Sequence, residues 1–91
     1  MAWTAIPGCT EIEINSSGNI RYGNSKVSIS IQVDRDGHNW IKVWGDAGGM
    51  VSMRVDEATL AAQVGLPGPG QIANHIDGDE RNDLVENLEW V

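Results

Sequence analysis

The sequence predicts a small α+β domain made of a β-meander, one short helix and a separate C-terminal element. Apolar and polar residues alternate with a period of two in the N-terminal half, and a single helix-like segment follows. A connector at 66–70, which holds two of the three prolines, separates that helix from the last twenty residues. Ninety-one residues, 41% of them hydrophobic, suffice for one domain with a modest core. We therefore expect a single domain over 1–91, with a β-rich part and short helix over 1–66 and a distinct motif over 71–91.

The predicted strands come from local alternation. The run Glu-Ile-Glu-Ile at 11–14 is typical of a half-buried strand, and 15–19 supply a turn. The clearest alternation lies at 27–33, where valine and isoleucine alternate with serine and glutamine, so one apolar and one polar face are expected. After a turn at 34–39, the aromatic and β-branched segment 40–44 predicts the second strand of a hairpin.

One short helix is predicted next. Asp56 is a candidate N-cap, because its carboxylate can accept a hydrogen bond from a backbone N–H of the first turn. Leu60, Ala61 and Val64 then fall on one side, and Gly65 is a stop signal. We expect this apolar side to pack on the sheet.

Isolated residues in the N-terminal part carry weaker signals. Trp40 and Trp44 lie four apart on a strand and so share a face, where core or sheet packing is a more common role than base stacking. His38, in a turn, is expected to be solvated. The single Cys9 cannot form an internal disulfide and is expected to be a reduced, partly buried thiol.

Charge and hydropathy narrow the function classes. Thirteen acidic and six basic residues give a net charge of −7, which opposes nucleic-acid binding because affinity for phosphate backbones comes largely from Lys and Arg. No apolar run approaches the ~18–20 residues of a membrane span, and the N-terminus lacks the features of a signal peptide. We therefore expect a cytoplasmic protein with no membrane partner.

Residues 72–91 concentrate the side chains that carry metal or proton-transfer chemistry, and three interpretations compete. Calcium binding is disfavoured, because counting from Asp77 puts glycine second and leucine twelfth, whereas an EF-hand loop needs glycine sixth and glutamate twelfth. A solvated acidic loop between two short strands is the plainest alternative. The third is a nuclease half-site, in which His75 deprotonates a water molecule and amide side chains fix the loop.

The letters and their spacing carry a resemblance. The motif Asn-His-Ile-Asp-Gly at 74–78, then Asn82, then Asn-Leu-Glu-Trp-Val at 87–91, resembles the core of the phage-type HNH homing endonuclease family. The N-terminal section, with Ile-Pro-Gly at 6–8, is more loosely similar to a small motif that often precedes this core. Arg54-Val55 and the helix up to Leu66 occupy the place of the family's His-Arg-Leu-Val segment, with Met53 where its histidine usually stands. The resemblance thus spans nearly the whole chain.

The resemblance implies a C-terminal HNH-like β-hairpin that, with a following helix, holds one divalent cation at the scissile phosphate. By position, His75 would be the general base, Asn87 would orient or brace the site, and Asn82 would hold the loop. Asn74 stands where many members have a metal-binding aspartate, and a neutral amide oxygen should bind Mg²⁺ more weakly than a carboxylate. No cofactor is firmly expected, but Mg²⁺ or another divalent cation would be required by a nuclease.

Two departures from the family pattern suggest impaired catalysis. The family continues beyond the position of Val91 into a helix that delivers another metal ligand, whereas this sequence ends there. Residues 71–91 also hold six acidic side chains against one arginine, so −5 of the total charge lies on the motif itself. A groove that binds DNA needs a positive charge.

We therefore expect a small acidic phage-type binding or inhibitory module, directed at a host nucleic-acid-binding protein in the host cytoplasm, as anti-defence and anti-CRISPR proteins are. The alternative is an active HNH endonuclease that cleaves DNA with a divalent metal and uses His75 as the base. A remnant without a partner is a third possibility. The acidic surface of the first interpretation consists of Asp77, Asp79, Glu80, Asp83, Glu86 and Glu89.

Overall fold

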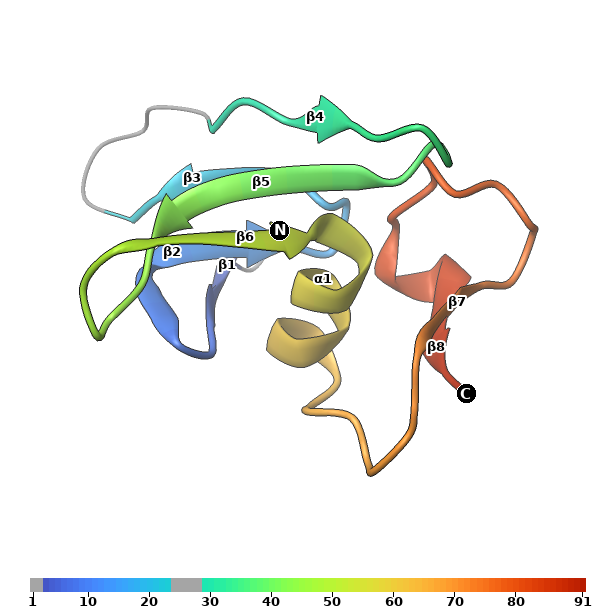
Figure 1. Cartoon of the computed structure of the whole chain (residues 1–91). Helices are drawn as coiled ribbons and strands as arrows, with labels where there is room; N and C mark the ends of the chain where they lie inside the picture. Colours follow the sequence, from blue (N-terminus) through green and yellow to red (C-terminus); the bar gives the residue numbers. More distant parts are fainter. Residues whose placement is uncertain (1–2, 24–28) are drawn as a thin grey trace.

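The computed structural model describes residues 3–23 and 29–91 and confirms the predicted α+β class, with eight strands in three small sheets around one helix (Figure 1). None of the described helices is long and apolar enough to cross a membrane. In chain order the elements are β1 (Trp3–Ile6), β2 (Cys9–Asn15), β3 (Ile20–Tyr22), β4 (Gln32–Val33), β5 (Asn39–Trp44), β6 (Met50–Arg54), α1 (Val55–Gln63), β7 (Ala73–His75), the 3-10 turn η1 (Val85–Asn87) and β8 (Leu88–Trp90).

The first sheet is an antiparallel meander in the order β1-β2-β3. Alternate residues of β2 point inward as the sequence predicts, since Ile12 and Ile14 are fully buried while Glu11 is exposed. Asn15 closes the expected turn, because its Oδ1 atom accepts hydrogen bonds from the backbone N–H groups of Ser17 and Asn19. This turn brings the end of β2 toward the C-terminal hairpin.

The second sheet, β4-β5-β6, contains the predicted hairpin, but its first strand is much shorter than expected. Only Gln32 and Val33 pair with β5, and Val27 lies outside the described residues. The side chains of Ile31 and Val33 are 44% and 50% exposed, so the expected buried apolar face is wrong for these residues. As an edge strand, β4 has a neighbouring strand on one side only, which limits the burial that its side chains gain.

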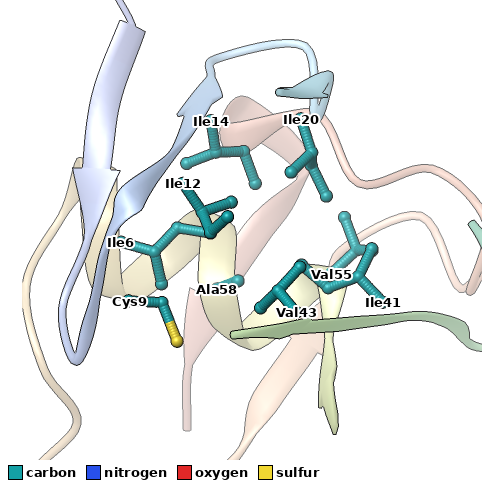
Figure 2. Close-up of a cluster of buried hydrophobic side chains, with 9 residues drawn as sticks. All are labelled: Ile6, Cys9, Ile12, Ile14, Ile20, Ile41, Val43, Val55 and Ala58. Carbon is teal, nitrogen blue, oxygen red and sulfur yellow. The ribbon is translucent and has the colours of Figure 1, made fainter. Parts of the chain in front are cut away.

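The alternation of β5 places aliphatic rather than aromatic side chains inward. Ile41 and Val43 are buried, whereas Trp40 and Trp44 share the opposite face and Trp44 is 55% exposed. Of the expected core or sheet-packing role, the core alternative is wrong for Trp44, while Trp40 is half-buried. Side chains alternate between the two faces of a strand, so the interior goes to the β-branched residues. The core is formed by Ile6, Cys9, Ile12, Ile14, Ile20, Ile41, Val43, Val55 and Ala58 (Figure 2).

Helix α1 packs against both sheets and against the C-terminal elements (Figure 1). Its N-cap is Arg54 and not Asp56, which lies inside the first turn and accepts the Glu57 N–H at 2.7 Å. The stop at Gly65 is confirmed: its φ is +136° and its N–H donates to the Leu60 carbonyl. Val64 is 65% exposed, so its expected place on the buried side is wrong.

The C-terminal motif forms the predicted hairpin of β7 and β8, in which Asn74 pairs with Glu89 and His75 with Leu88. Hydrogen bonds in both directions between Ile72 and Val91 extend this ladder. The Trp90 indole N–H donates to the Gly65 carbonyl, which ties the hairpin to the end of α1. The loop between β7 and β8 (residues 76–87), here named the motif loop, lies at the other end of the hairpin, where His75 and Asp56 of the first turn of α1 meet.

Candidate functional site

His75 lies at the end of β7, where the motif loop meets the start of α1. Its side chain is buried, and its Nε2 atom lies 2.8 Å from Oδ1 of Asp83, which is also buried. The second oxygen of Asp83 accepts a 2.8 Å hydrogen bond from the Asn39 amide. An ionised carboxylate only accepts, so Nε2 of the neutral ring carries the proton and Nδ1 keeps its lone pair.

A second buried carboxylate stands beside the same ring nitrogen. Oδ2 of Asp56 is 3.8 Å from Nε2 of His75, and the Asp56 side chain is 2% exposed. Its charge is balanced by Arg54, whose Nε and Nη2 atoms donate to the two carboxylate oxygens. These hydrogen bonds to the Asp56 carboxylate raise the pKa of the Arg54 guanidinium, which remains a cation at any physiological pH.

The three groups Asp56, His75 and Asp83 lie close enough to be considered as a metal centre, with one ligand atom of each within 4.8 Å of the others. The atoms that would bind a metal ion are, however, already engaged in hydrogen bonds with one another and with Arg54. Arg54 supplies the positive charge that a metal ion would otherwise bring to the buried carboxylates. We therefore interpret the cluster as a hydrogen-bonded charge network that holds His75.

A cavity of about 140 Å³ lies against this network. Among the five polar side chains that line it, His38 comes from the turn before β5, and its ring centroid is 6.4 Å from that of His75. Because the His38 side chain is only 18% exposed, the expectation of a solvated histidine is wrong. The lining residues are His38, Arg54, Ala73, Asn74, His75, Gly78 and Glu80.

Asn74 reaches the same cavity from the exposed side of β7. Its Nδ2 atom donates to Oε2 of Glu89 at 2.8 Å, across the hairpin. The amide is therefore oriented by its neighbour, and among the residues that the structure describes none donates a hydrogen bond to its Oδ1 atom. The structure thus brings Asn74 and His75, which the motif places side by side, to one cavity.

Asn82 and Asn87 brace the motif loop instead of contacting the His75 ring. The Asn87 side chain accepts the Asp77 N–H and donates to Oδ1 of Asp77 and to the Asn82 carbonyl. Asn82 donates to the other oxygen of Asp77 at 2.9 Å. Hydrogen bonds from Asn82, the Asp79 backbone and Asn87 hold the pKa of Asp77 below its usual range.

The six acidic residues of the motif do not form one surface. Asp83 is 6% exposed and is engaged within the protein, so its expected place on an acidic docking surface is wrong. Glu80 lines the cavity, and its Oε1 atom is 3.7 Å from Nε2 of His38. The exposed carboxylates are those of Asp77, Asp79, Glu86 and Glu89.

Sequence reasoning missed Arg54, Asp56 and His38 as members of this site. They precede the motif by about twenty to forty positions, and no spacing rule connects them to it. The available signals were Arg54, in the place of the family's His-Arg-Leu-Val segment, and Asp56, a candidate N-cap at the start of a helix expected to pack on the sheet. A charged residue there requires a partner.

Comparison with known proteins bears on the fold. No protein-family model and no curated protein matches the chain. One solved structure that does match is of the HNH homing endonuclease I-HmuI, described by its DNA binding and cleavage, with a TM-score of 0.88 and 24% identity. The match covers all of this chain and 52% of that one, so this chain spans about half of the length of that protein. The chain therefore has an HNH-type nuclease fold, as its C-terminal motif predicts.

Proposed function

We propose that this chain is an HNH-type nuclease that hydrolyses phosphodiester bonds of DNA, with His75 as the general base. The observation that carries the proposal is the buried Asp83–His75 pair beside the cavity. Asp83 fixes the ring tautomer and stabilises the imidazolium that forms when Nδ1 takes a proton from water. The resulting hydroxide attacks phosphorus, and the bond from phosphorus to the leaving oxygen breaks.

A divalent cation fits the donors that the cavity offers. Asn74 contributes a free amide oxygen and Glu80 a carboxylate, and oxygen atoms of these kinds are the ligands that Mg²⁺ prefers. Bound there, the cation would stabilise negative charge on the phosphate and on the leaving oxygen. Because Asn74 is neutral, we expect weaker binding than at a site with two carboxylates.

The similar solved structure supports DNA as the substrate. It is of a protein with the same fold that binds and cleaves DNA. The distribution of charge is compatible with this, because the carboxylates of Asp56 and Asp83 are buried and internally bonded. They therefore repel an approaching phosphate less than their number suggests.

A plasmid-nicking assay with Mg²⁺ or Mn²⁺ tests the proposal. We expect the wild-type protein to nick supercoiled plasmid, and His75→Ala to reduce the rate by at least about 10²-fold, since this is the usual contribution of a general base. Ile76→Ala is the matched control, because Ile76 neighbours His75 but is 58% exposed. Absence of nicking by the wild type, or equal rates in the two variants, would contradict the proposal.

The exposed carboxylates favour a second candidate function. Asp77, Asp79, Glu86 and Glu89 face solvent on a chain of net charge −7. Exposed carboxylates are complementary in charge to the basic groove of a host nucleic-acid-binding protein, as expected of an anti-defence or anti-CRISPR module without cleavage activity. Pull-down from nuclease-treated host lysate, compared between the wild type and a Glu86→Gln/Glu89→Gln variant, tests it. Retention that requires DNA, or that is unchanged in the variant, would argue against this candidate.

A further inference from the structure

We propose that Arg54 is the residue that binds and orients the phosphate group in the cavity beside His75. This inference rests on the proposed nuclease function and names a group that contacts its substrate. Arg54 lines the same cavity as His75 although the two lie 21 positions apart in the chain. The cavity is thus lined by both the cationic side chain of Arg54 and the proposed general base His75.

The Arg54 guanidinium is fixed before any ligand arrives. Two of its nitrogen atoms donate to the two oxygens of Asp56. Asp56 is itself held by the Glu57 N–H at 2.7 Å and is nearly inaccessible to solvent. A planar fork that is held on one edge loses little conformational entropy when its other edge binds.

Donors of Arg54 remain available for a phosphate. A guanidinium carries five N–H groups, and the bidentate pair with Asp56 uses two of them. Its side chain is 25% exposed, although it is anchored to a buried carboxylate. Two parallel N–H donors match the spacing of two phosphate oxygens, so the geometry suits bidentate binding.

Arg54 is also the single lysine or arginine that lines the cavity in the described part of the chain. Glu80 also lines the cavity, and its carboxylate would repel a phosphate. Asp56 partly neutralises the arginine as well. The recognition therefore depends on the shape of the guanidinium more than on net charge, and lysine should not replace it.

A titration with inorganic phosphate tests the inference without any need for cleavage. Backbone amide shifts of residues 73–78, followed by NMR, report phosphate at the cavity in the metal-free protein. We expect saturable shifts in the wild type, about five- to tenfold weaker affinity in Arg54→Lys, and unchanged affinity in the matched variant Arg81→Lys. Arg81 lies in the loop between β7 and β8, is exposed, and is not among the residues that line the cavity.

Glu80→Gln provides a second check, should the lysine variant fold poorly. Removal of this carboxylate should strengthen phosphate binding about two- to threefold, because it relieves repulsion at the cavity. Wild-type shifts that are absent or located elsewhere, or equal affinity in Arg54→Lys, would overturn the inference. Phosphate binding that depends on Arg54 in a protein that does not nick DNA would instead refute the nuclease proposal and leave the phosphate site standing.

Discussion

Nε2 of His75 lies 2.8 Å from Oδ1 of Asp83, and both side chains are about 5% exposed. The pair joins the strand that carries the histidine to the far end of the motif loop. It also connects this loop to the second sheet, because Asn39 at the start of β5 donates to the other Asp83 oxygen. The orientation of one imidazole ring therefore depends on three segments of the chain.

Asp83→Asn is expected to reduce plasmid nicking by about 10²-fold while the fold is retained. The amide is isosteric with the carboxylate, but it no longer stabilises the imidazolium that forms during proton transfer. Initial nicking rates measure the effect, and circular dichroism checks the fold. Glu86→Gln removes an exposed carboxylate of the same motif and should leave the rate unchanged. Equal losses in the two variants would indicate a general effect of charge.

Gly18→Ala is expected to destabilise the protein more than Gly8→Ala does. Both glycines have positive φ, +79° and +82°, so alanine is strained at either site by about 1–3 kcal/mol. A Cβ atom at position 18 would also lie 3.2 Å from the carbonyl oxygen of Asp83, whereas position 8 is open. Thermal unfolding should show the difference, and nicking should fall only in Gly18→Ala. Equal unfolding midpoints would show that the Asp83 backbone moves freely.

Asn87→Ala should lower the free energy of unfolding by about 2–3 kcal/mol. The change removes three hydrogen bonds of a residue that is 8% exposed, at roughly 1 kcal/mol each. Urea denaturation measures the loss. Asn19→Ala is a suitable control, because the Asn19 side chain is exposed and its recorded hydrogen bonds use the backbone. A loss below about 0.5 kcal/mol in Asn87→Ala would mean that the loop does not depend on this amide.

The stabilisation that Asp77 gives to the motif loop should be lost in acid, when its carboxylate is protonated. The pKa of Asp77 is lower in the folded protein than the value of about 3.9 for a free aspartate, chiefly because Asn82 donates to the carboxylate. The stabilisation is therefore complete above that value and is lost as the pH falls through the lower, folded-state pKa. The gap in melting temperature between the wild type and Asp77→Asn should be constant near neutrality and narrow below pH 4. A gap that widens in acid would mean that folding raises the pKa of Asp77 and does not lower it.

The contrast between β5 and β4 shows how far local pattern extends. The period-two rule placed both strands in one hairpin, and the structure confirms their pairing. The same rule could not show that Ile41 faces the core while Val33, near the sheet edge, is half exposed. Which face of a strand is covered, and over what length, depends on the elements that pack upon it.

The site shows the same division. The motif letters identified Asn74 and His75, which the structure brings to one cavity. They could not identify Asp83 as buried, because an aspartate in an acidic, turn-rich loop is ordinarily exposed. Its burial depends on two partners, His75 and Asn39, and the second of these lies 44 positions away.

By itself the sequence determined the α+β class, the C-terminal hairpin, the helix stop at Gly65 and the motif that carries His75. The fold class and the helix stop follow from interactions between residues near one another in the chain, which periodicity and turn chemistry report directly. The hairpin and the role of its motif were implied by the resemblance of the motif's letters and spacing to the HNH family. Only the tertiary structure decided which nitrogen of His75 is held and that Arg54, Asp56 and His38 stand beside it. Those relationships arise where α1, the turn before β5 and the motif loop meet, and packing between distant segments is not encoded in local spacing.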